Sequence, residues 1–149
     1  MEIKEIAIQY EEVIGPIIHR AEPPTPQSIE RIESELELRL PKSLVKFATL
    51  APNYGNWFAS LGADFDSLTH ILAINRDLRA DGTLPENYVA INVGYDDDYD
   101  CIDGQTFDAE SGEYLITYWS PDLDPAEGEI YRDFPSYLLQ QIDGWRQTI

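Results

Sequence analysis

Residues 88–103 read YVAINVGYDDDYDCID, and this stretch decides how the chain must fold. Tyr88–Val93 is a run of aromatic and β-branched residues typical of a buried strand, and Tyr99–Ile102 is a second such run. Residues 94–98, GYDDD, lie between the two runs and are too acidic for a core, because like charges this close repel one another. The stretch therefore predicts two antiparallel strands joined by an acidic turn.

The segments after this stretch extend the predicted sheet and add a helix. Glu113–Trp119 is a third strand-like run, and it is preceded by the turn-forming pair Ser111-Gly112. Near the C-terminus, apolar residues recur at helical spacing over about residues 135–142, and Gly144 is a typical helix stop. We expect an antiparallel meander followed by a C-terminal helix.

Two helices are predicted near the start of the chain. The apolar spacing over Ile3–Ile14 favours a helix, although the local alternation of Ile6, Ile8 and Tyr10 also fits a strand. After the proline-rich connector 22–26, a second helix is expected to begin at Pro26, with Thr25 as its cap. Its apolar stripe ends at the pair Leu40-Pro41.

Two more helices and a short strand are predicted before residue 88. Pro41 is placed to open a helix that runs to about Leu50. Trp57–Leu61 fits a short strand, and a further helix capped by Asp66 or Ser67 is expected to end at Asp81-Gly82. Helices followed by strands and a closing helix are the pattern of the α+β class. The length of 149 residues fits a single domain, 1–149.

The charge balance limits the partners that the chain can have. It carries 28 acidic and 10 basic residues, and its formal net charge is -18. Binding of nucleic acid or of an anionic membrane depends on clustered Lys and Arg, which are scattered along this sequence. A basic protein or a cation is the partner that such a surface favours.

The sequence also indicates the compartment. A single cysteine, Cys101, gives no disulfide framework. The first residues, MEIKE, lack the basic and apolar regions of a secretory signal, and no window is long and apolar enough to span a membrane. We therefore expect a cytoplasmic protein.

Catalytic and cofactor motifs are missing from the sequence. His19 lies next to a proline-rich connector and His70 lies in a predicted helix, so neither forms part of a nucleophile–base motif. Gly94 is followed by a tyrosine and three aspartates, which would repel a phosphate group. Cys101 reads as a small buried side chain rather than a thiolate. From these features we assign no catalytic residue and no cofactor, although an enzyme that uses a pair of carboxylates remains an alternative at this point.

The acidic turn partly matches a calcium-binding loop. Asp96, Asp98 and Asp100 occupy the first, third and fifth positions of an EF-hand register. The register fails at the sixth position, which holds Cys101 instead of Gly, and at the twelfth, which holds Phe107 instead of Glu. No metal ligand is therefore assigned, but an irregular divalent-cation site remains an alternative.

Three stretches resemble the SUKH superfamily, which groups bacterial immunity proteins with a fungal cell-wall-synthesis regulator. The first is residues 29–47, with a helix, the Leu40-Pro41 corner and a second helix, followed by the turn Asn53-Tyr54-Gly55. The others are the strand region 84–103 and the helix start at residues 134–139. The resemblance covers about residues 22–149, and three aspartates stand where the family often has small residues or glycine in the central turn.

The resemblance implies a non-catalytic fold that binds and neutralises a cognate toxin domain, commonly a nuclease-type enzyme, and such toxins are often basic. We therefore expect an immunity protein whose acidic surface occludes a basic toxin. A regulatory protein-interaction scaffold is the alternative, and the sequence leaves the oligomeric state open. The candidate toxin-binding residues are Tyr95, Asp96, Asp97, Asp98, Tyr99, Asp100 and Asp103.

Overall fold

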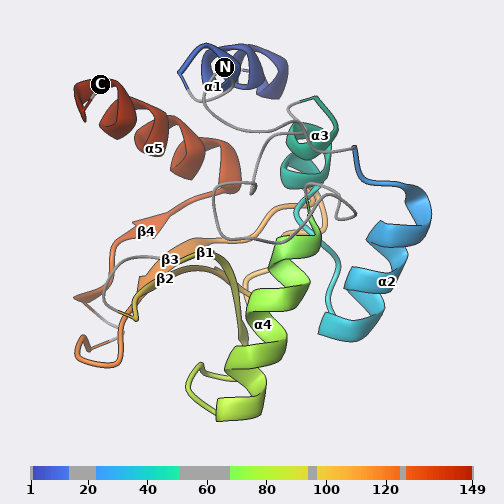
Figure 1. The fold of residues 1–149 in the computed structure, drawn as a ribbon, viewed down its shortest axis with the longest axis vertical. Coiled ribbons are helices and arrows are strands. Elements are labelled where there is room, and N and C mark those ends of the chain that lie inside the picture. Colours follow the sequence, from blue (N-terminus) through green and yellow to red (C-terminus); the bar gives the residue numbers. More distant parts are fainter. Residues whose placement is uncertain (1, 14–22, 51–67, 94–96, 125–126, 149) are drawn as a thin grey trace.

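The computed structural model describes residues 2–13, 23–50, 68–93, 97–124 and 127–148. Within these residues, four helices are followed by four strands and then by a last helix (Figure 1). The strands form one antiparallel sheet in the order β1-β2-β3-β4, which confirms the predicted α+β class. The helices are α1 (Ile3–Val13), α2 (Pro26–Leu36), α3 (Lys42–Leu50), α4 (Thr69–Asp81) and α5 (Phe134–Thr148), and the strands are β1 (Tyr88–Val93), β2 (Tyr99–Asp103), β3 (Ile116–Trp119) and β4 (Ile130–Tyr131).

The helices α1, α3 and α5 pack against one another through buried aromatic rings. The ring of Tyr10 meets that of Phe47 edge to face, with centroids 5.0 Å apart, and Phe47 lies 5.8 Å from Phe134. Tyr10 also meets Trp145 at 6.1 Å. The expected end of the last helix at Gly144 is wrong, because α5 runs on to Thr148 and brings Trp145 against α1.

Local capping explains where α2 begins and ends. The Thr25 hydroxyl accepts from the Ser28 amide at 3.1 Å, and the Ser28 hydroxyl accepts from the Thr25 amide at 3.0 Å. Pro26 occupies the first helical position, as predicted. The helix ends at Leu36 rather than at Leu40, because Glu37 adopts a left-handed conformation with φ 56°.

The sheet differs from the expectation in two places. The third strand begins only at Ile116, because Glu113 forms a bridge with Asp108 in a separate hairpin and Tyr114 donates its hydroxyl to the Arg39 carbonyl. The two-residue strand β4 was not predicted. The strand expected at Trp57–Leu61 lies outside the described residues, as do the proposed caps of α4.

One carboxylate from this hairpin caps a helix that is far away in the sequence. Pro41 precedes α3 and offers no capping side chain. Glu113 supplies the cap: its Oε2 accepts from the Ser43 amide at 2.9 Å, and its Oε1 accepts from the Ser43 hydroxyl at 2.6 Å. A negative charge at a helix N-terminus also stabilises the helix dipole.

Replacing Glu113 with Ala is expected to lower the free energy of unfolding by about 1 to 2 kcal/mol, the usual cost of a lost helix cap. Glu113→Gln keeps an acceptor for Ser43 and is expected to cost less. Urea unfolding of both variants gives the comparison. Glu110→Ala, in the same hairpin but exposed, is the control. Equal losses for Glu113→Ala and Glu110→Ala would contradict the capping role.

Candidate functional site

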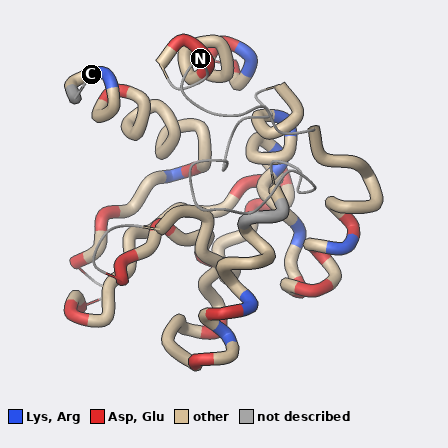
Figure 2. The backbone as a smooth tube through the Cα atoms, in the orientation of Figure 1, with Lys and Arg blue, Asp and Glu red and all other residues tan. Residues whose placement is uncertain are grey.

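Acidic residues gather at one end of the sheet. In an antiparallel meander the β1–β2 and β3–β4 connections lie at the same end, because each strand reverses the direction of the one before it. Between Arg79 and Arg132 the sequence has 14 acidic residues and no Lys or Arg. Figure 2 marks Asp and Glu positions in red along the loops at this end of the sheet, on the left of the view. We call it the acidic end, and its described residues are Asp97, Asp98, Asp122, Asp124, Glu127 and Glu129.

The predicted site residues near the turn are only partly described. Tyr95 and Asp96 lie outside the described residues. Asp97 is exposed, and its φ of 58° puts it in the left-handed region. Asp98 Oδ2 accepts from the Tyr118 hydroxyl at 2.8 Å, which fixes the turn to β3.

Asp103 lies at the opposite end of β2 from this turn. Its Oδ1 accepts from Asn87 Nδ2 at 3.2 Å and from the Gln105 amide at 3.1 Å. These bonds hold the start of β1 against the end of β2. The structure therefore does not bring Asp103 together with Asp97 and Asp98.

Asp100 points into the molecule. Its Oδ2 accepts from the Tyr137 hydroxyl at 2.7 Å and from Asn92 Nδ2 at 3.0 Å, so it joins β1, β2 and α5. Burial raises the pKa of the Asp100 carboxyl above its ordinary value of 3.8. The two hydrogen bonds oppose this shift, and the nearby charges of Asp98 and Glu129 add to it.

This raised pKa gives a prediction for the dependence of stability on pH. The folded state holds the Asp100 proton more tightly than the unfolded state, so the group stabilises the fold fully below its unfolded pKa. That contribution is lost as the pH rises through the folded pKa. Asn at this position carries no charge and keeps an acceptor for Tyr137. We therefore expect Asp100→Asn to gain stability relative to the unmodified chain as the pH rises from about 4 to about 7.5.

Urea unfolding of the two proteins at both pH values measures this difference. Asp97→Asn is the matched control, because Asp97 is exposed and Asn tolerates its left-handed conformation. We expect a pH-dependent difference in the free energy of unfolding for Asp100→Asn that is larger than the one for Asp97→Asn. A constant difference at the two pH values would contradict it.

Beside the acidic end lies a strip of aromatic and apolar side chains on one face of the sheet. Val93 pairs with Tyr99 and Tyr99 with Trp119, and the Tyr99 and Trp119 rings stack at 6.1 Å with an interplanar angle of 28°. Ile130 pairs with Thr117, two residues from Trp119, and so shares this face. Val93 is 38 % exposed and Ile130 is 59 % exposed. We call Val93, Tyr99, Trp119 and Ile130 the aromatic strip.

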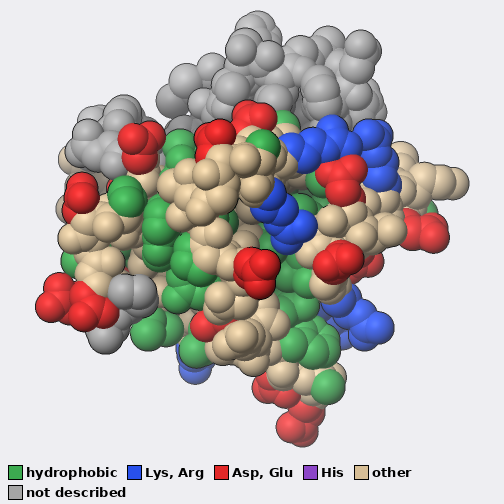
Figure 3. All heavy atoms as spheres, turned by 90° about the horizontal axis from the view of Figure 1, so that it is seen from below, with side chains coloured by type: hydrophobic (Ala, Val, Ile, Leu, Met, Phe, Trp, Pro, Cys, Tyr) green, Lys and Arg blue, Asp and Glu red, His purple; other side chains and the backbone are tan. Residues whose placement is uncertain are grey.

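Apolar area bordered by charge is the usual anatomy of a protein interface. Figure 3 shows hydrophobic and acidic side chains next to one another at the left of the face that it presents. Only Tyr99 of the aromatic strip was among the predicted site residues. The acids of the β3–β4 loop were also missed, although the absence of Lys and Arg over residues 80–131 could have indicated them.

A comparison with protein families supplies the identification. The family model SUKH_5, described as SMI1-KNR4 cell-wall, matches residues 3–143. The chain belongs to this family. The match confirms the resemblance to the SUKH superfamily. It begins at residue 3 and therefore includes α1, which lies before the residues that resemble the family in the sequence analysis. A search of curated proteins finds no match.

Membership of the SMI1-KNR4 family supports a role in toxin immunity or in regulation of the SMI1-KNR4 kind. Proteins of this family are generally non-catalytic and act through contacts with other proteins. In this SMI1-KNR4 chain, none of the described helices is long and apolar enough to cross a membrane.

In the described parts of the chain, Cys101 is buried and the carboxylates form no metal-binding group. The Cys101 side chain is fully buried, as expected, and burial raises the pKa of its thiol. The described residues include no group of three or more His, Cys, Asp or Glu side chains placed to hold a metal ion. Of the three aspartates in the EF-hand register, Asp96 is not described and Asp100 is bonded to Tyr137 and Asn92.

Proposed function

We propose that this chain is an immunity protein that binds and neutralises a basic, nuclease-type toxin domain in the cytoplasm. The observation that carries the proposal is the acidic end, where two connections rich in carboxylates lie at the same end of the sheet and no Lys or Arg lies between residues 80 and 131. A nuclease holds phosphate with Lys and Arg, and carboxylates pair with the same side chains. An acidic surface that covers them would exclude the nucleic acid substrate.

Capture and affinity come from different residues in this mechanism. The exposed carboxylate of Asp97 and the partly exposed carboxylate of Asp98 steer the toxin into contact, because complementary charge raises association rates by about 10- to 1000-fold. Exposed ion pairs add only about 0 to 1 kcal/mol each. Val93, Tyr99 and Ile130 of the aromatic strip supply the contact area, and the buried Trp119 holds the Tyr99 ring in place by stacking.

Growth rescue tests the proposal. The C-terminal domain encoded by the neighbouring upstream gene is expressed in a bacterial host with and without this chain. We expect the domain to stop growth and the chain to restore it, with both proteins co-purifying. A toxic domain that this chain neither binds nor neutralises would contradict immunity against that partner.

The family description favours one second candidate. It names a cell-wall family, and a regulatory scaffold of that kind would bind an endogenous protein through the same surface. The scaffold predicts that deletion of this gene changes the phenotype of a host without the neighbouring toxin gene. Immunity predicts no change in that host.

A further inference from the structure

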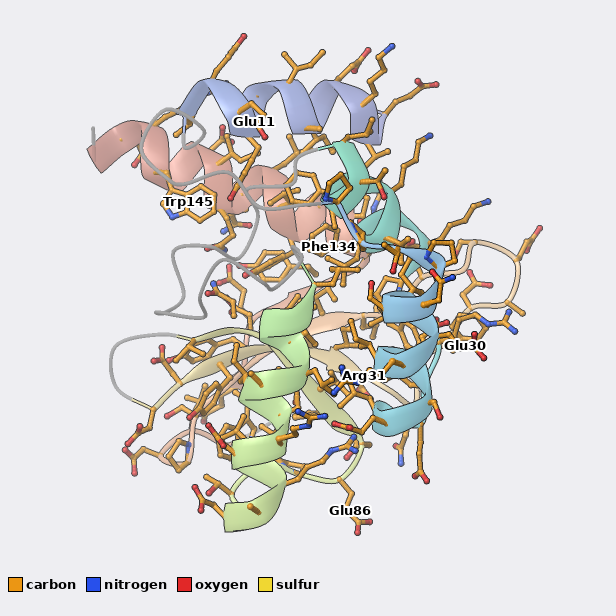
Figure 4. All side chains as sticks on the ribbon, turned by 45° about the vertical axis from the view of Figure 1, so that its right-hand side comes forward. Glu11, Glu30, Arg31, Glu86, Phe134 and Trp145 are labelled. Atoms are coloured by element: carbon orange, nitrogen blue, oxygen red, sulfur yellow. The ribbon has the colours of Figure 1, made fainter. Side chains whose placement is uncertain are left out.

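A hollow lies at the C-terminal ends of α2 and α4. It has a volume of about 700 Å³ and lies between the ends of α2 and α4 and the segment that leads into β1. Binding pockets for small groups typically measure about 300 to 1000 Å³. Its walls include Leu36, Leu84, Pro85 and Tyr88, and its carboxylates are Glu37 and Glu86. Figure 4 shows α2 and α4 side by side, with Glu86 at the lower edge.

Arginines of α4 fix the walls of this hollow. Arg76 forms a bidentate pair with the Glu35 carboxylate, with both N–O distances 2.6 Å. Arg79 donates to the Leu36 carbonyl at 3.2 Å and to the Glu35 carbonyl at 3.4 Å, so its guanidinium is bonded to the end of α2. The two helix ends are therefore held at a set distance before any partner arrives.

The electrostatics of the hollow favour a cation. Two helix C-termini meet there, and each carries a partial negative charge. Glu37 and Glu86 are exposed, and within the described part of the chain neither side chain takes part in a hydrogen bond or an ion pair. Arg79 offsets one of these two charges, so the hollow keeps a net negative charge.

We propose that this hollow receives an arginine side chain of the basic partner. Leu36, Leu84 and Pro85 suit the three methylene groups of arginine, which pack well on apolar surface. The Tyr88 ring gives a face on which a guanidinium can stack, and the two carboxylates match its fork of donors.

This inference rests on the proposed function for its partner, but it is tested without the toxin. The probe is N-acetyl-arginine methylamide, titrated at millimolar concentration into the ¹⁵N-labelled chain and followed by NMR. The neutral isostere N-acetyl-citrulline methylamide is the control. We expect arginine, and not citrulline, to shift the amide signals of residues 36–37, 82–84 and 86–88.

Two double variants test where the arginine probe binds. Glu37→Gln combined with Glu86→Gln is expected to weaken arginine binding at least fivefold, and both sites are exposed, so the fold is retained. Asp97→Asn combined with Asp98→Asn removes the same charge at the acidic end and is expected to leave the hollow unaffected. Equal binding of citrulline, equal loss in both variants, or shifts spread over all acidic surfaces would overturn the inference.

The two proposals fail separately. If the arginine probe does not bind the hollow while growth rescue succeeds, the hollow is not an arginine site and immunity stands. If the probe binds as expected while rescue fails, the hollow is a guanidinium site and the toxin proposal is overturned for that partner.

Discussion

Asn75→Ala is expected to lower the free energy of unfolding by about 3 to 5 kcal/mol, because it leaves two buried backbone groups of β1 without partners. Asn75 is fully buried on α4. Its Oδ1 accepts from the Ala90 amide at 2.9 Å, and its Nδ2 donates to the Ala90 carbonyl at 2.8 Å and to the Ile71 carbonyl at 2.7 Å. Strand β1 is an edge strand, and Asn75 takes the place of a neighbouring strand at this point.

Each buried group that loses its hydrogen bond costs about 1 to 3 kcal/mol, and the deleted amide leaves a small cavity as well. Urea unfolding followed by circular dichroism measures the loss. Asp77→Ala, on the same helix but exposed, is expected to stay within about 0.5 kcal/mol of the unmodified chain. A loss below 1 kcal/mol for Asn75→Ala would show that Ala90 finds other partners.

Phe134→Ala is expected to cost about 3 to 5 kcal/mol, the usual range for a buried phenylalanine. Phe134 is fully buried at the start of α5, and its ring lies 5.8 Å from Phe47 and 6.0 Å from Tyr137. Figure 4 shows it between the helices and the sheet. Its removal leaves a cavity where α3, α5 and the sheet meet, so thermal and urea unfolding both measure the effect.

Phe107→Ala is the matched control, because it removes the same side chain from a position that is 38 % exposed. Phe107 keeps one ring contact, with Tyr114 at 5.0 Å, so a loss of about 1 kcal/mol is expected there. The prediction for Phe134 fails if the two variants lose similar stability.

Features that depend on neighbouring residues could be predicted from the sequence. Thr25 and Pro26 mark the start of α2 because a cap and a first-turn proline act within one helical turn. Gly82 ends α4 for a similar reason, with φ 66° in the left-handed region. The strands Tyr88–Val93 and Tyr99–Ile102 were found from their composition.

Features that depend on tertiary contacts could not be predicted. The cap of α3 comes from Glu113, 70 residues away from Ser43. Strand β4 has only two residues and exists because it pairs with β3. Gly144 is a helix stop in isolation, but the packing of Trp145 on α1 continues the helix through it.

The candidate site also combines features that the sequence shows with features that depend on tertiary contacts. The acidic turn is visible in the sequence, and Asp97 is exposed as the proposal requires. That Asp100 points inward follows from its bonds to Tyr137 and Asn92, on two other elements. The acids of the β3–β4 loop join the site only because the meander returns its second connection to the same end of the sheet.

We propose that the acidic end captures a basic toxin. The most direct measurement is the association rate of the purified chain with the toxin domain at low and at physiological salt. One variant combines Asp97→Asn, Asp98→Asn and Glu129→Gln. The control variant, with the same change in net charge on exposed helix surfaces, combines Glu12→Gln, Glu30→Gln and Asp77→Asn.

We expect the association rate of the acidic-end variant at low salt to be lower by about tenfold or more, because steering depends on local charge. The control variant should keep most of the rate, and the unmodified chain should slow as salt is added. Equal rates for the two variants, or a rate that salt does not change, would contradict capture by the acidic end.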